Sequence, residues 1–229
     1  MKQYDLQNIR NVGLIGHAGS GKTSIAEAIL FLSGVNDRLG KVGDASSVMD
    51  YDPDEIQRGN SVNASVAFCE WDKIKINLVD TPGDINFIAD TPASLRVVDG
   101  AIIVISAVDG VQFYTEKVWG WATDLGIPKI IFINKIDHEQ ADLSSVVESI
   151  KKKFNVNPLC VHVPVGSGEK ISGVVDVLAN KSYSYKKDGS GKNEVSVISE
   201  SMAEEVKSTY AELTELIAEV DDNLTENYL

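Results

Sequence analysis

The sequence predicts an α/β protein: a doubly wound domain with a mostly parallel sheet over residues 1–157, followed by a small α+β subdomain over residues 158–229. Short apolar runs rich in β-branched residues alternate with helical segments in the first part. A glycine-rich turn joins the first apolar run to the first helical segment. Beyond Pro158 the apolar runs become shorter, which indicates a change of architecture.

The first domain begins with a buried strand at Asn11–Ile15 and a helix at Lys22–Ser33, which Gly34 ends. Residues 35–60 show no clear period, and a connector of that length indicates a functional loop. Alternating apolar and polar residues then predict an antiparallel hairpin on either side of Trp71–Asp72. The remaining expected elements are the buried parallel strands Ala101–Ala107 and Lys129–Asn134 and the helices Phe113–Leu125 and Glu139–Phe154.

The second domain reads as short strands followed by one helix. The expected strands are Leu159–Val165, Gly173–Leu178, Lys181–Lys187 and Glu194–Ile198, with a turn at Gly189–Lys192. Apolar residues recur at helical spacing from Met202 to Val220. Ser201 and Glu204 have the spacing of a capping box, which predicts where this helix begins.

The composition is typical of a globular protein, with 43% apolar and 24% charged residues. The formal net charge is −13, and the segment Glu194–Leu229 alone has ten acidic residues and one lysine. Such a chain has no general attraction to nucleic-acid phosphates, so we expect no binding to DNA. No apolar run approaches the roughly 20 residues that span a bilayer, and the first ten residues lack a secretory signal. We therefore expect a cytoplasmic monomer without membrane contact.

A phosphate-binding motif of the form G-x-x-x-x-G-K-[ST] lies between the first strand and the first helix. It comprises Gly16, His17, Ala18, Gly19, Ser20, Gly21, Lys22 and Thr23. Glycine allows the backbone to approach a phosphate closely, and the helix N-terminus faces the anion. We expect Lys22 to reach the β- and γ-phosphates and Thr23 to hold Mg²⁺. The fold is therefore predicted to be a P-loop NTPase.

A second motif, Asp-Thr-Pro-Gly, ends the second strand of the hairpin. It comprises Asp80, Thr81, Pro82 and Gly83. A carboxylate at Asp80 can hold Mg²⁺ through water. The N–H group of Gly83 is expected to contact the γ-phosphate, a contact that exists only with the triphosphate, so the motif indicates a switch.

A third motif, Asn-Lys-Ile-Asp, follows another buried strand and comprises Asn134, Lys135, Ile136 and Asp137. Guanine presents adjacent N1–H and N2–H donors, which one carboxylate accepts together, and adenine has no such pair. Asp137 is thus predicted to select GTP and GDP, while Lys135 packs over the base. This disfavours a metabolic ATPase or kinase.

These motifs in this order resemble those of the elongation factor G family of translational GTPases. Met49–Ser61 resembles that family's first switch, Val108–Gln112 and Glu116–Trp119 its next strand–helix junction, and the part after Pro158 the subdomain inserted in its G domain. The resemblance covers essentially the whole chain. It implies that Ser61 takes the place of a switch threonine that binds Mg²⁺ and the γ-phosphate.

The resemblance implies a ribosome-dependent GTPase that promotes movement of tRNA and mRNA in elongation. The implied partners are ribosomal RNA and the ribosomal stalk protein, the latter through the acidic helix Ser201–Val220, although a solvated face is the simpler interpretation of that helix. The alternative within the class is a ribosomal-protection or release-type translational GTPase. The alternative outside it is a GTP-dependent ribosome-binding module with weak hydrolysis.

Two residues depart from the family's pattern. Asp84 stands where the family has a histidine that positions water, and Gly19 stands where it has an aspartate. We assign catalytic roles to Lys22, Gly83 and Asp84, but three hypotheses for Asp84 stay open. It orients water, it caps the helix that follows, or it replaces the missing aspartate in binding an ion.

The resemblance also predicts that the chain is a fragment. Guanine-binding domains usually have a third base-contacting loop of the Ser-Ala type near their end. Ser106–Ala107 precedes the base reader at Asn134, and nothing after Asn180 fits. We therefore expect that the first domain lacks its last strand and helix, that the inserted subdomain is truncated, and that guanine affinity is weakened.

Overall fold

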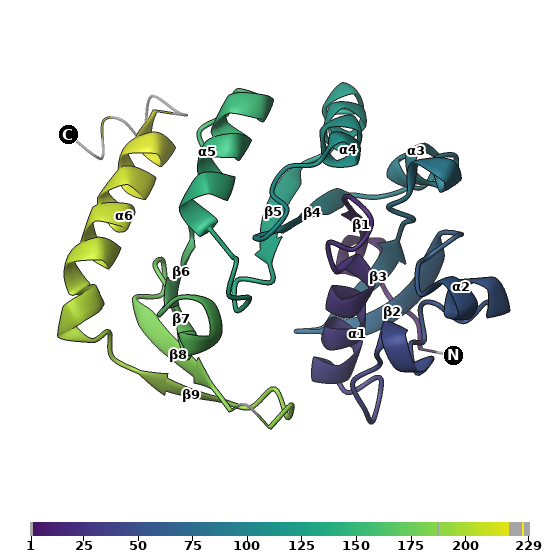
Figure 1. The fold of residues 1–229 in the computed structure, drawn as a ribbon, viewed down its shortest axis with the longest axis horizontal. Helices are drawn as coiled ribbons and strands as arrows, with labels where there is room; N and C mark the ends of the chain where they lie inside the picture. The colour runs from purple at the N-terminus through teal and green to yellow at the C-terminus, as the bar shows by residue number, and fades with distance from the viewer. Residues whose placement is uncertain (1, 187, 220–225, 227–229) are drawn as a thin grey trace. The chain divides into compact units, whose positions relative to one another are not determined.

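A five-stranded sheet in the order β2-β3-β1-β4-β5 organises the first part of the chain (Figure 1). The strands are β1 (Ile9–Ile15), β2 (Ser65–Trp71), β3 (Ile74–Asp80), β4 (Gly100–Ser106) and β5 (Lys129–Asn134). β1 pairs in parallel with β3 and β4, β4 pairs in parallel with β5, and β2 is antiparallel to β3. The predicted mostly parallel sheet is confirmed. The computed structural model describes residues 2–186, 188–219 and 226.

Helices flank this sheet. They are α1 (Lys22–Leu32), α2 (Pro53–Arg58), α3 (Asp90–Leu95), α4 (Phe113–Asp124) and α5 (Leu143–Phe154), with short 3-10 turns η1 (Leu6–Asn8), η2 (Val42–Asp44) and η3 (Ile85–Phe87). The apolar side of α1 packs on the sheet, where Ala26 and Leu30 form a buried cluster with Leu14 of β1 and Leu78 of β3. This packing fixes the N-terminus of α1 beside the carboxyl end of β1.

Helix α5 begins at Leu143, not at Glu139 as the sequence suggested. The amide N–H of Ala141 donates to the carbonyl of His138 at 3.0 Å, which closes a turn before the helix. Asp142 then accepts a hydrogen bond from the N–H of Ser145 at 2.9 Å, as an N-cap residue does. The cap therefore sets a later start than the apolar period alone indicated.

A second, antiparallel sheet has the order β6-β7-β8-β9, and this confirms the predicted α+β subdomain. Its elements are β6 (His162–Val165), η4 (Gly168–Lys170), β7 (Gly173–Asp176), β8 (Lys181–Tyr185), β9 (Asn193–Ser196) and α6 (Glu200–Ala218). Val163 and Val175 of the sheet pack with Val206 and Leu213 of α6. The ends of two expected elements, Lys187 and Val220, lie outside the described residues.

The expected capping box of the last helix is wrong. Helix α6 begins at Glu200, so its N-cap is Ser199 and Ser201 lies inside the first turn. The hydroxyl of Ser199 lies 3.0 Å from the hydroxyl of Ser201 and makes no capping hydrogen bond to the backbone. The helix uses the earlier of two nearby serines, although only Ser201 has a glutamate three residues later.

By their contacts, the residues divide into two compact units. The first is Met1–Lys135 with Asp142–Ser149, and the second is Ile136–Ala141 with Ile150–Leu229. The division falls between Lys135 and Ile136, inside the predicted base-reading motif. The domain boundary predicted after residue 157 stays a prediction. No helix in the described part of the chain is long and apolar enough to cross a membrane.

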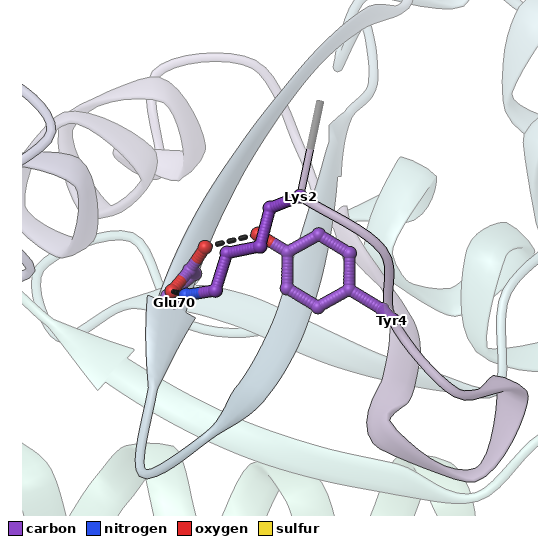
Figure 2. A network of polar contacts seen from close by, with 3 residues as sticks. All are labelled: Lys2, Tyr4 and Glu70. Atoms are coloured by element: carbon purple, nitrogen blue, oxygen red, sulfur yellow. Dashed lines mark hydrogen bonds and ion pairs between the residues drawn. The ribbon is translucent and has the colours of Figure 1, made fainter.

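The segment before β1 is held against β2 by a small polar network (Figure 2). The ammonium of Lys2 and the hydroxyl of Tyr4 both donate to the carboxylate of Glu70. Lys75 lies 5.5 Å from the centre of the Tyr4 ring and 4.7 Å from that of Phe68. The hydrogen bonds from Lys2 and Tyr4 lower the pKa of Glu70.

Candidate nucleotide-binding site

The turn between β1 and α1 has the shape that only glycine allows at two of its positions. Gly16 and Gly21 have φ angles of 145° and 99°. A Cβ on Gly16 would overlap the carbonyl oxygen of Val104, and one on Gly21 would overlap the side-chain amide of Asn134. That amide donates to the carbonyl of Ser20 at 2.9 Å. The phosphate-binding turn is therefore built on the carboxyl ends of β4 and β5 as well as β1.

Lys22 is buried at the first position of α1, where its ammonium donates to the carbonyl of His17 at 3.1 Å. Burial lowers the pKa of Lys22, and the charges of Asp80 and Asp50 oppose that shift. Gly83 packs directly against this group, because a Cβ there would overlap the Lys22 ammonium. Its carbonyl accepts from the N–H of Ala18 at 2.9 Å. The two predicted motifs thus touch through their backbones.

Four oxygen-bearing side chains gather beside Lys22. The hydroxyl of Thr23 donates to Asp80 at 2.6 Å and lies 3.2 Å from the hydroxyl of Ser61, which donates to Asp50 at 2.7 Å. Burial raises the pKa of Asp80 to about 7, although Lys22 opposes that rise, and burial also raises the pKa of Asp50. Asp80 Oδ1 and Asp50 Oδ2 are buried and have no hydrogen-bond partner among the described residues.

A cavity of about 320 Å³ opens over these groups. It is lined by Ala18, Gly19, Gly21, Lys22, Thr23, Ser24, Val42, Asp50, Gly59, Asn60, Ser61, Gly83, Asp84, Asn134 and Lys135. Residues from all three sequence motifs and from the loop at 35–60 therefore share one cavity. Each motif comes from a different part of the sheet, and the strand order places their ends together.

The other predicted site residues lie away from the lining of this cavity. Asp80 is fully buried beneath it, Thr81 donates to the carbonyl of Leu14 at 2.8 Å, and the carbonyl of Pro82 accepts from Thr91. Gly16, His17 and Ser20 form the walls of the turn, and the last two border a separate small void. Ile136 and Asp137 belong to the second unit, where Asp137 lines another cavity. Base recognition by Asp137 stays a prediction.

Asp84 lines the cavity and also caps the 3-10 turn η3. Its Oδ1 atom accepts hydrogen bonds from the backbone N–H and the side-chain amide of Asn86, both at 2.9 Å. Of the three hypotheses for this residue, the observed geometry favours the cap. The roles in orienting water or binding an ion stay predictions.

The sequence alone indicated no role in the site for two residues, Asp50 and Glu55. Asp50 had no assigned role, although it reaches the oxygen cluster through Ser61. Glu55 is buried and accepts from the N–H groups of Val62 and Asn63 at 2.9 and 3.1 Å, which folds the loop back toward Ser61. Neither residue belongs to a sequence motif with a characteristic spacing. The one available signal was a proline after Asp52, which predicts the short helix α2 inside the loop.

The sequence matches the family described as elongation factor Tu GTP binding domain over residues 7–226. The chain belongs to this family. A relative named elongation factor G 2 from Syntrophus aciditrophicus (strain SB) is 39% identical to this chain over 225 residues. That match covers 98% of this chain and 33% of the relative. The predicted resemblance to translational GTPases of the elongation factor G type is confirmed.

A solved crystal structure of a protein from Thermus thermophilus has the same fold as this member of the elongation factor Tu GTP-binding-domain family. The match has a TM-score of 0.89 with 32% sequence identity, and it covers 96% of this chain and 33% of the other. The predicted P-loop α/β fold with its additional subdomain is thereby confirmed. The chain spans about one third of the length of both relatives.

Proposed function

We propose that this chain binds GTP and GDP and hydrolyses GTP as the nucleotide-binding part of a cytoplasmic translation factor. The observation that carries the proposal is the single cavity that the Lys22 turn, the Gly83 backbone and the Asn134–Lys135 pair share. Phosphates fit beside the turn, because its backbone and the N-terminus of α1 face the cavity and Lys22 supplies positive charge. Asp137 then recognises the guanine base, as its place in the motif predicts.

The oxygen cluster fits Mg²⁺. Thr23 and Ser61 supply hydroxyl oxygens and Asp80 a carboxylate, and hard cations prefer such ligands. The unpartnered Asp80 Oδ1 is a buried acceptor of the kind that a cation or its bound water satisfies. When bound, Mg²⁺ would neutralise charge on the phosphates. The protein's own contribution is to hold Thr23, Ser61 and Asp80 within one hydrogen-bonded group.

In this proposal Lys22 and Gly83 act on the γ-phosphate. Lys22 contributes a buried positive charge at the point where negative charge develops in phosphoryl transfer. Gly83 rests on the phosphate-binding turn through its carbonyl, and a larger residue would displace Lys22. The N–H of Gly83 would contact the γ-phosphate, and this second contact exists only with the triphosphate, so the motif can report which nucleotide is bound.

The full activity in this proposal is ribosome-dependent GTP hydrolysis that drives movement of tRNA and mRNA. The relative named elongation factor G 2 supports that step, and a ribosomal-protection or release-type factor is the alternative. The partners would be ribosomal RNA and the stalk protein. The test is GTP hydrolysis by the protein with and without ribosomes. The proposal expects a rate that rises with ribosome concentration, and a rate that ribosomes do not change would contradict it.

A GTP-dependent binding module with weak hydrolysis is the second candidate function. The observation in its favour is that Asn86 engages Oδ1 of Asp84 with two hydrogen bonds at the edge of the cavity. This candidate expects the substitution Asp84→His to raise ribosome-stimulated hydrolysis about tenfold or more, since a negative charge near the phosphates is removed. Unchanged or lost activity in the Asp84→His variant would exclude it and would favour Asp84 as a working part of the GTPase.

A further inference from the structure

Glu27 is a fully buried carboxylate on α1, four residues after Thr23. It lies on the side of the helix that carries the buried Ala26 and Leu30, where an apolar residue is expected. Three donors from one loop converge on its Oε1 atom. They are the hydroxyl of Ser47 at 2.8 Å and the N–H groups of Val48 at 2.6 Å and Met49 at 3.1 Å.

The loop also closes around the other oxygen of this carboxylate. The side-chain amide of Asn36 donates to Oε2 of Glu27 at 3.4 Å. Gly40 is buried against the same oxygen, and a Cβ at that position would overlap it. Residues 36–49 therefore surround one buried carboxyl group, and burying such a polar group is costly unless its hydrogen bonds are made. We call these residues, together with Glu27, the Glu27 clamp.

The Glu27 clamp is connected to the oxygen cluster through a short relay. The hydroxyl of Ser47 accepts from the N–H of Asp50 at 3.1 Å. Asp50 accepts from Ser61, and Ser61 lies 3.2 Å from Thr23. This chain of hydrogen bonds therefore connects Glu27 with Thr23, which lies one turn earlier on the same helix, α1. Hydrogen bonds thus connect Ser61 to Glu27, a carboxylate that does not line the nucleotide cavity.

We propose that Glu27 is a positioning residue that sets how tightly this protein binds GTP relative to GDP, by holding Asp50 and Ser61 beside Thr23. The proposal rests on the proposed function. The phosphate-binding turn is expected to contact both GDP and GTP, whereas the loop can contact a γ-phosphate only when GTP is bound. Releasing the loop therefore weakens triphosphate binding and leaves diphosphate binding in place.

The test is the affinity of the protein, with Mg²⁺ present, for GDP and for the non-hydrolysable β,γ-imido analogue of GTP. Glu27→Ala removes the acceptor, whereas Glu27→Gln keeps an amide oxygen for the three donors on Oε1. Glu27→Ala is expected to lower analogue affinity about tenfold and to change GDP affinity less than about twofold, and Glu27→Gln is expected to lower analogue affinity less than Glu27→Ala does. Equal losses for the two nucleotides, or no loss for either, would overturn the proposal.

Gly40→Ala provides a second variant that keeps Glu27 itself. Its Cβ displaces the same carboxylate, so it is expected to lower the analogue-to-GDP affinity ratio in the same direction. Val118→Ala is the matched control. Val118 is fully buried on α4, and its truncation removes core packing without touching the Glu27 clamp. A ratio that falls as far in Val118→Ala as in Glu27→Ala would show that general destabilisation is responsible, and would contradict the proposal.

Backbone amide hydrogen exchange separates this proposal from the proposed function. The N–H groups of Val48 and Met49 donate to Glu27, so their exchange should accelerate about tenfold or more in Glu27→Ala. If the unmodified protein bound no guanine nucleotide, the proposed function would be wrong. Accelerated exchange at these two amides in Glu27→Ala would nevertheless show that Glu27 holds the loop. Unchanged exchange at both amides would refute the clamp even if nucleotides bind.

Discussion

The phosphate-binding turn and the loop at residues 36–63 line the same cavity, but different interactions hold them in place. The turn is fixed by close packing of its backbone: Gly16 approaches the Val104 carbonyl and Gly21 the Asn134 side-chain amide so closely that no Cβ fits. The loop is fixed by side chains, since the buried carboxylates of Glu27, Asp50 and Glu55 accept hydrogen bonds from its N–H and hydroxyl groups.

This difference has a functional consequence. The turn's shape depends on its glycines and on the strands against which they pack, whereas the loop's shape depends on carboxylates that single substitutions can remove. Changes at the turn should therefore weaken both GDP and GTP, and changes at the loop should weaken GTP alone. The following predictions test that contrast, beginning with the largest expected effect.

The substitution Lys22→Ala removes the one buried ammonium beside the oxygen cluster in the described part of the chain. A hydrogen bond to a charged group contributes up to about 3 kcal/mol, so both GDP and GTP-analogue affinity should fall roughly a hundredfold. Titration calorimetry with each nucleotide measures this. A loss of affinity for the GTP analogue alone would contradict this prediction, because Lys22 would then contribute only to triphosphate binding, as the loop is expected to do.

Gly83→Ala tests the contact between the two motifs. The added Cβ would overlap the Lys22 ammonium and would lie 2.5 Å from the N–H nitrogen of Ala18, so one of them must move. Overpacking costs about 1–3 kcal/mol, and we expect both nucleotides to bind about tenfold more weakly. Gly59→Ala is a comparison variant with open space around its Cβ, although its φ of 65° adds strain. Unchanged affinity in Gly83→Ala would show that the contact is not needed for binding.

Arg58→Ala should have a smaller effect, limited to the triphosphate. The guanidinium of Arg58, at the end of α2, lies 5.8 Å from the centre of the Phe87 ring in η3. An exposed cation–π contact contributes about 0.5–1 kcal/mol, so GTP-analogue affinity should fall about threefold while GDP affinity holds. Phe87→Leu should reproduce the change, because it also removes the ring. Titration of both variants with GDP and with the GTP analogue measures these changes. A fall in analogue affinity in only one of the two variants would contradict the assigned contact.

Glu70→Gln should leave nucleotide binding unchanged, because Glu70 lies in the N-terminal network (Figure 2) and does not line the cavity. Its folded-state pKa lies below the ordinary 4.5, so it contributes stability at pH 7 that is lost as the pH falls through the folded-state pKa. Urea unfolding at pH 7 should show the variant slightly less stable. The difference should vanish in acid, and a difference that grew in acid would contradict the assigned contacts.

The same contrast explains how much could be predicted from the sequence. The fold and the turn were predicted, because local patterns encode strands, helices and the glycine-rich turn between them. The place of Ser61 beside Thr23 was implied only by the family resemblance, since Ser61 lies in a loop without a clear pattern. The start of α5 and the cap of α6 were misplaced, since several polar residues compete there as caps. Glu27 was missed because a carboxylate at an apolar helix position is explained only by a loop that lies elsewhere in the chain.

The most direct test of the central claim is titration calorimetry of the protein with GDP and with ADP in the presence of Mg²⁺. The account predicts saturable binding of one GDP per chain and at least about a hundredfold weaker binding of ADP, since the Asn134–Asp137 motif supplies a carboxylate for guanine. Equal affinity for the two nucleotides, or no binding of GDP, would contradict it.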